Sequence, residues 1–302
     1  MEVITVTYRN DIQLLALQAH SLALNILYDD IERITVVIND EDSAGVRRLF
    51  DTHVAKLYGS LTDRVSVIEA PGGKDGWAAQ QGLKLDRVRC SPSEYCLILD
   101  AKNHLVRSAC RQHFIDERGR PRLHLVDGFG DRRRWLASSL GYFGVDNTYL
   151  HRPALPTTTP YTVRVDLMRE MVLEIERREG RDIRDWFITK PGRQTEFLLY
   201  YSYLLSEFGS LHDIVDTSLR EQPCLFRRGP TTEQAKRKLF RYARHGALFF
   251  GLHPGRMTAL SDWDTKQIIR LWSERELMSP QAAQRVLNGE PVWAALDAAP
   301  SA

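Results

Sequence analysis

The sequence predicts an α/β protein, built on a mostly parallel β-sheet with helices on its faces. The first hundred residues alternate between short runs rich in β-branched residues and longer stretches with apolar residues at helical spacing. The strand-like runs are nearly continuous in apolar residues, as expected for strands covered on both faces. An apolar fraction of 43% over 302 residues is enough for one large core or two modest ones.

The first half is expected to hold four strands separated by three helices. We predict strands at residues 3–8, 34–38, 65–69 and 95–100, helices at 12–27, 42–58 and about 77–90, and a glycine-bearing loop at 71–76. Each strand–helix–strand unit is typical of a parallel sheet. Ligands of such sheets bind beyond the carboxyl ends of the strands, so polar residues there are the first candidates for a site.

The second half is less regular and more helical. A helix is predicted at residues 163–178, ending near Gly180. Another is framed by Thr195, which can cap its start, and Gly209, which can stop it. An acidic residue, Glu196, lies in the first turn of this helix.

Towards the C-terminus, Thr231 followed by Gln234 resembles a capping box and predicts a basic helix. The apolar run at residues 247–252 then reads as a strand that ends at His253. A last helix is expected at about 262–277. The alanine- and proline-rich tail after it is expected to fray.

Composition narrows the class of protein. No stretch approaches the roughly 18 consecutive apolar residues of a membrane span, and the N-terminus runs directly into a strand without a signal peptide, so we expect a cytoplasmic protein. The 41 basic and 39 acidic residues give no overall attraction for polyanions, so nucleic acid is not an expected partner. The basic helix at 233–244 could contact the inner surface of the membrane.

Polar residues gather at the predicted carboxyl ends of three strands. They are Thr7 and Tyr8 after the first strand, Asn39 and Asp40 after the second, and Asp100 and Lys102 after the fourth. Turn formers also close purely structural strands, but their coincidence on one edge favours a binding site. We therefore predict an open cleft that Asp100 shares with Asn39, Asp40 and His253.

Residues 76–108, GWAAQQGLKLDRVRCSPSEYCLILDAKNHLVRS, resemble a family of GT-A-like bacterial proteins associated with surface-polysaccharide synthesis. Members of that family combine a QQ-x-x-K-L helix with a strand ending in LD-x-K. TEFLLYYSYLL looks like the family's acidic-aromatic helix, and FFGLHPGR looks like its strand ending in histidine. The resemblance extends over about residues 1–256. It implies a GT-A fold and transfer of a sugar from a nucleoside diphosphate to a glycan or lipid-linked acceptor.

The resemblance also implies a diphosphate site, which in GT-A enzymes often holds a divalent cation, Mn²⁺ or Mg²⁺, on a DxD motif. The matching stretch is Asp100-Ala101-Lys102, whose third position is not acidic. Asp100 would then be a metal ligand, with His253 as the C-terminal histidine that completes the metal or diphosphate site. Lys102 could instead supply positive charge to the phosphates and reduce the need for metal.

The resemblance implies that Glu196 is the catalytic base, and its place at a helix N-terminus would keep the carboxylate ionised and able to accept a proton. Without the resemblance, an acidic residue in a first turn would be interpreted as structural, since it opposes the helix dipole. Asp127 is a rival on the glycine-flexible loop VDGFGDRRR. The resemblance implies that the donor is bound by Thr7, Tyr8, Asn39, Asp40, Gln81, Lys84 and Lys102. Asp40 would bind the base of the nucleotide. Gln81 and Lys84 lie three residues apart and so share one helix face. Trp77, Trp135 and Tyr161 could stack on sugar or base.

We expect residues 1–110 to be the nucleotide-sugar-binding half, residues 111–256 an acceptor-side half that completes the same domain, and residues 257–302 C-terminal helices and tail. Inverting transfer is slightly favoured over retaining transfer. Two alternatives stay open. One is a nucleotidyltransferase, although the loop after the first strand lacks glycine, and the other is a binding or scaffold protein without catalysis.

Overall fold

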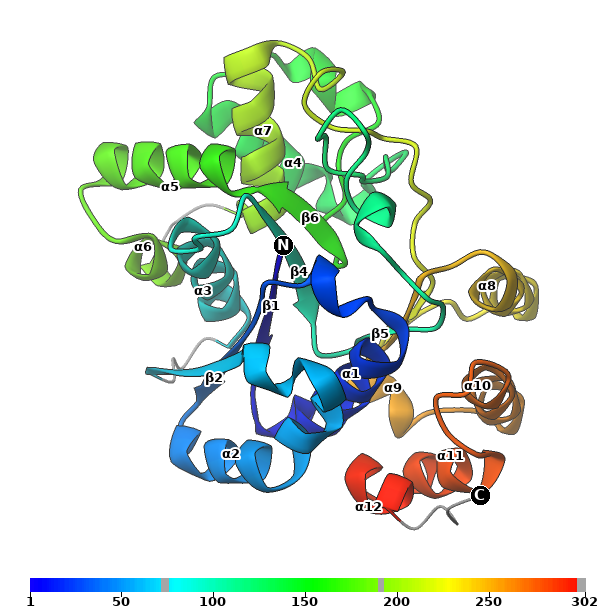
Figure 1. Cartoon of the computed structure of the whole chain (residues 1–302). Helices are drawn as coiled ribbons and strands as arrows, with labels where there is room; N and C mark the ends of the chain where they lie inside the picture. The colour runs from blue at the N-terminus through cyan, green and yellow to red at the C-terminus, as the bar shows by residue number, and fades with distance from the viewer. Residues whose placement is uncertain (72–75, 190–192, 298–302) are drawn as a thin grey trace.

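The computed structural model describes residues 1–71, 76–189 and 193–297. At its centre is a five-stranded sheet in the order β3-β2-β1-β4-β6 (Figure 1). Its strands are β1 (Glu2–Thr7), β2 (Arg33–Asp40), β3 (Val65–Pro71), β4 (Tyr95–Asp100) and β6 (Tyr161–Arg164). Strands β1 to β4 run parallel, and β6 pairs antiparallel with β4 at the edge. The predicted α/β class with a mostly parallel sheet is confirmed.

Helices α1 (Ile12–Asn25), α2 (Ser43–Leu49) and α3 (Gly76–Arg89) connect the parallel strands. The helix expected at 42–58 is shorter than predicted, because α2 is followed by a π-helical turn at Phe50–Val54 and 3₁₀ turns to Arg64. Gly59 breaks this stretch with φ of 55°, a left-handed conformation that glycine adopts without strain. Most of the predicted glycine loop, residues 72–75, lies outside the described residues.

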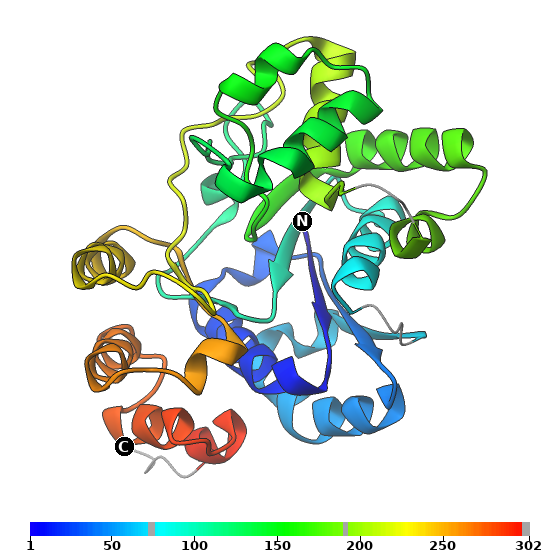
Figure 2. The ribbon, with the colours of Figure 1, turned by 180° about the vertical axis from the view of Figure 1, so that it is seen from behind.

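The sheet separates two apolar clusters. Side chains alternate along each strand, so Val3 and Leu97 pack on one face while Ile4 and Ile98 pack on the other. Helices α3, α4 (Arg133–Tyr142), α5 (Val165–Glu179), α6 (Ile183–Thr189) and α7 (Glu196–Phe208) contribute to the second cluster. Figure 2 shows these helices, in green and cyan, apart from the orange and red C-terminal helices.

In the second half, β6 is a strand that the sequence pattern did not reveal. Its four residues continue directly into α5, whose residue 165 is the first helical one, so only a short run marks the strand. Helix α5 ends at Gly180 and α7 at Gly209, both with φ near 65° in the left-handed region, as predicted. The expected hydroxyl cap of α7 is wrong, because the Thr195 side chain makes no capping hydrogen bond.

A second, three-stranded sheet joins distant parts of the chain. It contains β5 (Asn103–Leu105), β8 (Phe249–Leu252) and β7 (Cys224–Leu225) in that order. Helix α8 (Glu233–His245) leads into β8, and its capping residue is Thr232, one residue later than predicted. Short helix α9 (Pro254–Met257) follows β8 directly.

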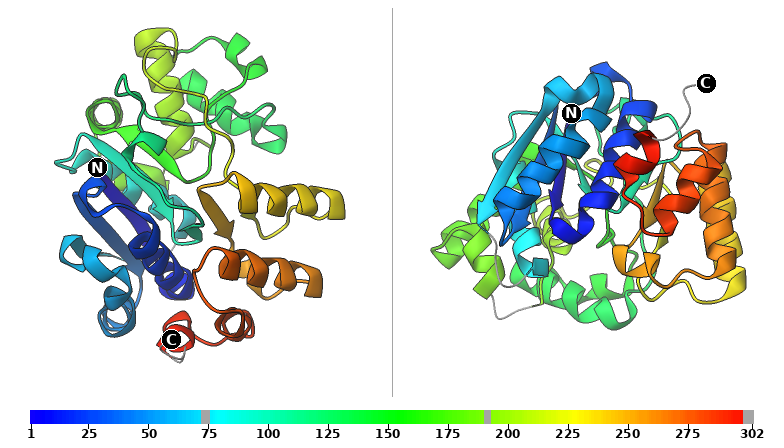
Figure 3. Two further views of the ribbon diagram at one scale, coloured as in Figure 1. Left: turned by 45° about the vertical axis from the view of Figure 1, so that its right-hand side comes forward. Right: turned by 90° about the horizontal axis from the view of Figure 1, so that it is seen from below.

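The C-terminal segment is more ordered than its composition suggested. After α10 (Asp262–Glu274) come α11 (Pro280–Leu287) and α12 (Val292–Asp297), so the expected fraying is wrong for this part of the tail. Their alanine and valine side chains are buried in the same cluster as α1, and Gln13 Oε1 accepts the N–H of Val292 at 2.8 Å. Figure 3 shows α12, in red, beside α1. Within the described ranges, no helix is long and apolar enough to cross a membrane.

Candidate functional site

A cleft of about 660 Å³ lies at the carboxyl ends of β1, β2 and β4. Its walls include Tyr8 and Asp11 after β1, Asn39, Asp40 and Glu41 at and after the end of β2, Asp100 and Lys102 around the end of β4, His253 after β8, and Trp77 and Gln80 on α3. The cleft that Asp100 was expected to share with Asn39, Asp40 and His253 is therefore present. Parallel strands bring these residues together because their carboxyl ends meet at one edge of the sheet.

A second, smaller pocket adjoins this cleft. It has a volume of about 90 Å³ and shares Trp77, Gln80 and Asp100 with the larger cleft. The rest of its wall is supplied by Gln81 and Lys84 on α3, Trp135 on α4, Thr157 and Thr159 in the loop before β6, and Thr195, Glu196 and Phe197 at the start of α7. Asp100 thus stands at the junction of two compartments.

Both oxygens of the Asp100 carboxylate contact ammonium groups. Lys84 Nζ donates to Oδ1 at 2.7 Å, and Lys102 Nζ contacts Oδ2. Burial alone would raise the pKa of Asp100, but Lys102 and Lys84 outweigh it and hold that pKa well below its usual range. Asp100 is therefore ionised at neutral pH.

Lys84 also reaches the predicted base. Its Nζ lies 3.4 Å from Glu196 Oε1, and the side chains of both residues are only 7% exposed. Burial opposes the charge on Lys84, but Asp100 and Glu196 outweigh it and raise the pKa of the ammonium group. The buried ammonium therefore bridges β4 and α7. Lys84 lines the small pocket and not the larger cleft.

Glu196 differs electrostatically from the expectation. Burial raises the pKa of its carboxyl group above the ordinary value, although Lys84 acts in the opposite direction. Burial therefore affects the pKa of Glu196 more than the helix N-terminus does, and its carboxylate is more basic than that of an exposed glutamate. Gln81 holds the backbone in place, because its Oε1 accepts the N–H of Glu196 at 3.3 Å.

His253 is half-buried in the cleft wall. Its Nδ1 accepts the N–H of Gly255 at 3.0 Å, which caps α9. Burial, together with Lys102 and Arg227, lowers the pKa of the ring, so it is neutral near pH 7. A neutral ring whose Nδ1 accepts carries its proton on Nε2, so that nitrogen is a donor.

The two residues that end β2 have different roles. Both carboxylate oxygens of Asp40 accept backbone N–H groups, from Arg9 at 2.8 Å and from Asp42 at 3.0 Å, so Asp40 shapes the loops around the cleft. Asn39 is 7% exposed, and its Oδ1 is buried without a hydrogen-bond partner among the described residues. A buried acceptor without a partner is costly unless a ligand satisfies it.

Three predicted residues do not line the cleft or the smaller pocket. Thr7 is fully buried in β1, Asp127 is exposed in the loop before α4, and Tyr161 is fully buried and stacks on Phe197 with ring centroids 4.0 Å apart. Tyr161 is therefore a core residue. Thr7 does lie at the end of β1, but its side chain is buried in the protein and does not reach the cleft.

The sequence reading also missed Asp11. It lines the cleft, and its Oδ1 is buried without a partner among the described residues. Burial, reinforced by the negative charge of Asp100, raises the pKa of Asp11 to about 7. The residue lies four positions past the end of β1, where a polar residue before a helix reads as an ordinary cap.

The two predicted metal ligands, Asp100 and His253, do not fit a divalent cation. A cation needs free oxygen or nitrogen lone pairs, whereas both oxygens of Asp100 contact ammonium groups and the free nitrogen of His253 carries a proton. Among the residues that the structure describes, no three histidine, cysteine, aspartate or glutamate side chains are grouped to hold a metal. The ammonium group of Lys102 and the Nε2–H of His253 instead suit an anion.

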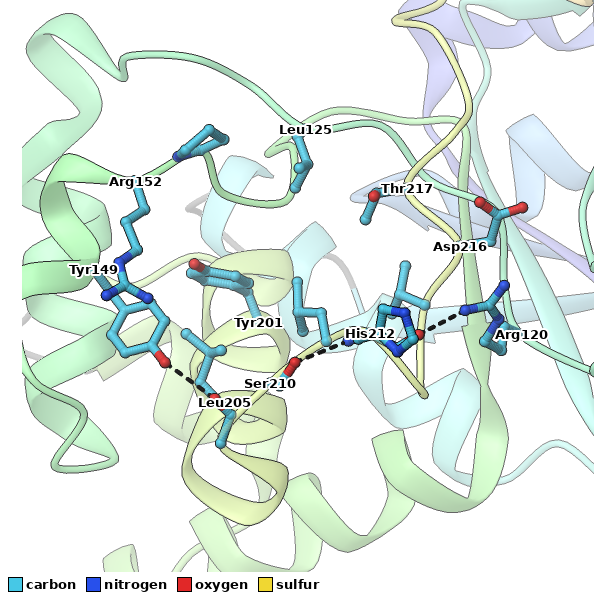
Figure 4. A pocket seen from close by; sticks show the side chains of 14 residues that line it. Arg120, Leu125, Tyr149, Arg152, Tyr201, Leu205, Ser210, His212, Asp216 and Thr217 are labelled. Carbon is cyan, nitrogen blue, oxygen red and sulfur yellow. Dashed lines mark hydrogen bonds between the residues drawn. The ribbon is translucent and has the colours of Figure 1, made fainter.

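A further cavity of about 570 Å³ shares no lining residue with the cleft (Figure 4). It lies between α7, which contributes Tyr201 and Leu205, and the segments around Arg120 and Tyr149. Its walls are tied together by hydrogen bonds, from the Tyr149 hydroxyl to the Gly209 carbonyl at 3.0 Å and from Arg120 Nη1 to the His212 carbonyl at 2.6 Å. None of the predicted site residues lies there.

The parallel sheet and the cleft at its carboxyl edge define a protein of the GT-A fold class. A solved glycosyltransferase shares this fold. The apo structure of the bifunctional glycosyltransferase WbbM has a TM-score of 0.52 at 10% identity, over 95% of this chain and 51% of that chain, so the present chain spans about half its length. Galactosyltransferase LgtC in complex with donor and acceptor sugar analogues has a TM-score of 0.46 at 11% identity, over 83% of this chain and 87% of that one. No protein-family model matches the sequence, and no curated protein sequence matches it.

Proposed function

We propose that the protein transfers a sugar from a nucleoside diphosphate donor to a glycan or lipid-linked acceptor, in bacterial cell-surface polysaccharide synthesis. One observation supports this most strongly. Asp100 stands between a large cleft, whose wall presents the ammonium group of Lys102 and the side-chain amide of Asn39 beside several carboxylates, and a small pocket that contains a buried carboxylate, Glu196. Sugar transfer needs these two compartments side by side, because the acceptor hydroxyl must attack the same carbon atom that the diphosphate leaves.

The nucleoside diphosphate belongs in the larger cleft. The free Oδ1 of Asn39 can accept a hydrogen bond from the base or ribose. Lys102, 14% exposed, can bind the diphosphate, and His253 can donate to it from Nε2. Because the donor set does not fit a metal ion, we assign the neutralisation of the diphosphate to the ammonium group of Lys102. Asp100 fixes that ammonium group in the cleft wall.

Transfer would proceed by direct displacement. An oxygen of the acceptor hydroxyl forms a bond to the anomeric carbon while the bond from that carbon to the diphosphate oxygen breaks. The hydroxyl proton passes to Glu196, whose raised pKa makes it an effective base. Negative charge develops on the departing diphosphate next to Lys102, where a fixed cation stabilises it. This scheme inverts the anomeric centre, and Glu196 is the proposed base in preference to the exposed Asp127.

Calorimetry and turnover test the proposal together. We expect the purified protein to bind uridine or guanosine diphosphate, and Glu196→Gln to bind it equally well while turnover of the sugar nucleotide falls about 10²- to 10⁴-fold. Glu207→Gln, at an exposed position near the end of the same helix, is the matched control and should change neither binding nor turnover. Absence of nucleotide binding with and without manganese would favour the scaffold alternative.

We also propose that the protein works in the cytoplasm and touches the inner membrane surface through α8. Lys238 and Arg241 are exposed on this helix, and neither forms an ion pair among the described residues. Cationic side chains are attracted to anionic lipid by about 1 kcal/mol each. Salt-sensitive flotation with anionic liposomes, lost in Lys238→Gln/Arg241→Gln, is the expected result. Flotation that is equal for both proteins would exclude this contact.

A further inference from the structure

A pair of tryptophans lies at the rim of the candidate site. Trp77 is 60% exposed and packs against Trp135, with ring centroids 5.5 Å apart and ring planes tilted by 37°. Large apolar side chains that remain in water are informative, because burying them would stabilise the fold. An exposed pair of aromatic rings beside a pocket is typical of a ligand contact.

The two rings connect three compartments. Trp77 lines both the large cleft and the small pocket of Glu196, and Trp135 lines the small pocket. Both also line a third, open hollow of about 390 Å³, with Ala78, Arg134, Ile188 and Arg193 among its other wall residues. A molecule in this hollow would lie against the aromatic pair, and both rings also line the small pocket that contains Glu196, the proposed base.

The hollow combines apolar and cationic character. Ile188 is 43% exposed and extends the apolar surface beside the two rings. Arg134 and Arg193 are exposed, and neither has an ion-pair or hydrogen-bond partner among the residues that the structure describes. Many other arginines in the protein contact a carboxylate, as Arg89 does with Glu176 at 2.7 Å. Two unpaired guanidinium groups beside an aromatic surface favour a ligand with both a ring and a negative charge.

We propose that this hollow binds the acceptor, and that the acceptor is a sugar ring joined to an anionic group. A pyranose has a face of C–H groups that can pack on Trp77 and Trp135, and a rim of hydroxyls. Arg134 and Arg193 would pair with the negative group, leaving one hydroxyl directed towards Glu196. This inference rests on the proposed function and adds the acceptor class to it. The anion has two sources, a phosphate link to a lipid or nucleotide-like carrier and the carboxylate of a uronic acid.

The test measures acceptor binding apart from donor binding. The protein is first saturated with the nucleoside diphosphate that binds in calorimetry, so that the large cleft is filled. Quenching of tryptophan fluorescence is then followed with the α-1-phosphates of glucose, galactose and mannose, with methyl uronides, and with the neutral methyl glycosides. We expect one of the two anionic sets to bind about tenfold more tightly than the neutral set. The set that binds identifies the source of the charge.

Variants locate the binding. Arg134→Gln is expected to weaken binding of the anionic sugar about tenfold and to leave neutral sugars and nucleoside diphosphate unchanged. Arg48→Gln, at an exposed arginine of α2 that forms no ion pair within the described ranges, is the matched control and should change none of them. Trp77→Ala should reduce the quenching by every sugar that binds, since its ring is part of the contact.

Two results would overturn the inference. Neutral and anionic sugars that bind equally, or not at all, while nucleoside diphosphate still binds, would show that the hollow is not an acceptor site of this class. Arg134→Gln or Trp77→Ala that weakens only nucleoside diphosphate binding would assign the aromatic pair to the donor instead. Failure of nucleoside diphosphate to bind to the wild-type protein would refute the proposed function itself, which is a separate outcome.

Discussion

Replacing Lys102 by methionine should weaken nucleoside diphosphate binding by about 2 to 3 kcal/mol, which is about 30- to 150-fold in Kd. The magnitude follows from the position of the ammonium group. It lies in the cleft wall with 14% of its side chain exposed, so it is partly shielded from water, and a charge-assisted hydrogen bond at such a site contributes more than one at the surface. Methionine preserves most of the stem, so the change removes charge more than volume. Asp100 keeps Lys84 as its second partner.

Isothermal titration calorimetry in EDTA and then in manganese measures this effect. The wild-type protein should bind equally well in both, because Lys102 supplies the charge. Lys102→Asp introduces the acidic third position of a DxD motif. Nucleoside diphosphate binding by this variant should disappear in EDTA and return with manganese. Lys266→Met, at an exposed lysine of α10, is the control. The reasoning is refuted if Lys102→Met binds as tightly as the wild type, or if EDTA abolishes wild-type binding.

Three further results are expected. The pKa of Asp11 is about 7 in the folded protein and near 3.8 when unfolded, so the folded state binds a proton that the unfolded state has lost, and stability falls between about pH 4 and 7. Asp11→Asn should remove this loss, raising the free energy of unfolding at pH 8 by up to about 4 kcal/mol. Above pH 7 the ionised Asp11 in the cleft wall should repel the diphosphate and lower its affinity, and Asp11→Asn should remove this fall. An unchanged pH profile in urea unfolding and calorimetry would contradict this. Lys84→Met leaves the buried carboxylate of Glu196 without a partner and should lower the free energy of unfolding in urea by about 3 kcal/mol. Adding Glu196→Gln should recover part of that loss. A double variant no more stable than Lys84→Met would disprove the coupling. Asn39→Ala should weaken nucleoside diphosphate binding about fivefold to tenfold by calorimetry while stabilising the empty protein slightly, since an unpartnered buried oxygen is removed; unaltered affinity would show that the amide does not contact the nucleotide.

The periodic pattern of the first hundred residues predicted the sheet well because each strand is long, apolar and bounded by turn formers. The same reasoning brought Asp100, Asn39 and Asp40 to one edge, since parallel strands end together. β6 escaped notice because its four residues merge into α5 without a turn. The sequence pattern therefore reveals a strand only where turn residues separate it from the next element.

The environment of each side chain was harder to infer. Lys84 was expected to contact the donor, but α7 packs against α3 and supplies Glu196 as a second partner of its ammonium group. Tyr161 looked available for stacking, yet Phe197 covers it. In both cases the deciding contact comes from a residue more than thirty positions away in the chain, and helical spacing carries no information about such neighbours. The packing of α12 against α1 has the same origin.

The ammonium group of Lys84, held between Asp100 and Glu196, has a consequence for descent. Losing Lys84 would leave the buried carboxylate of Glu196 without a cationic partner, so a change at this position is penalised before any effect on turnover. Homologous chains should therefore keep lysine, aspartate and glutamate together or exchange them as a set. A copy that retains the sheet but has only two of the three would mark a lineage in which the site has decayed.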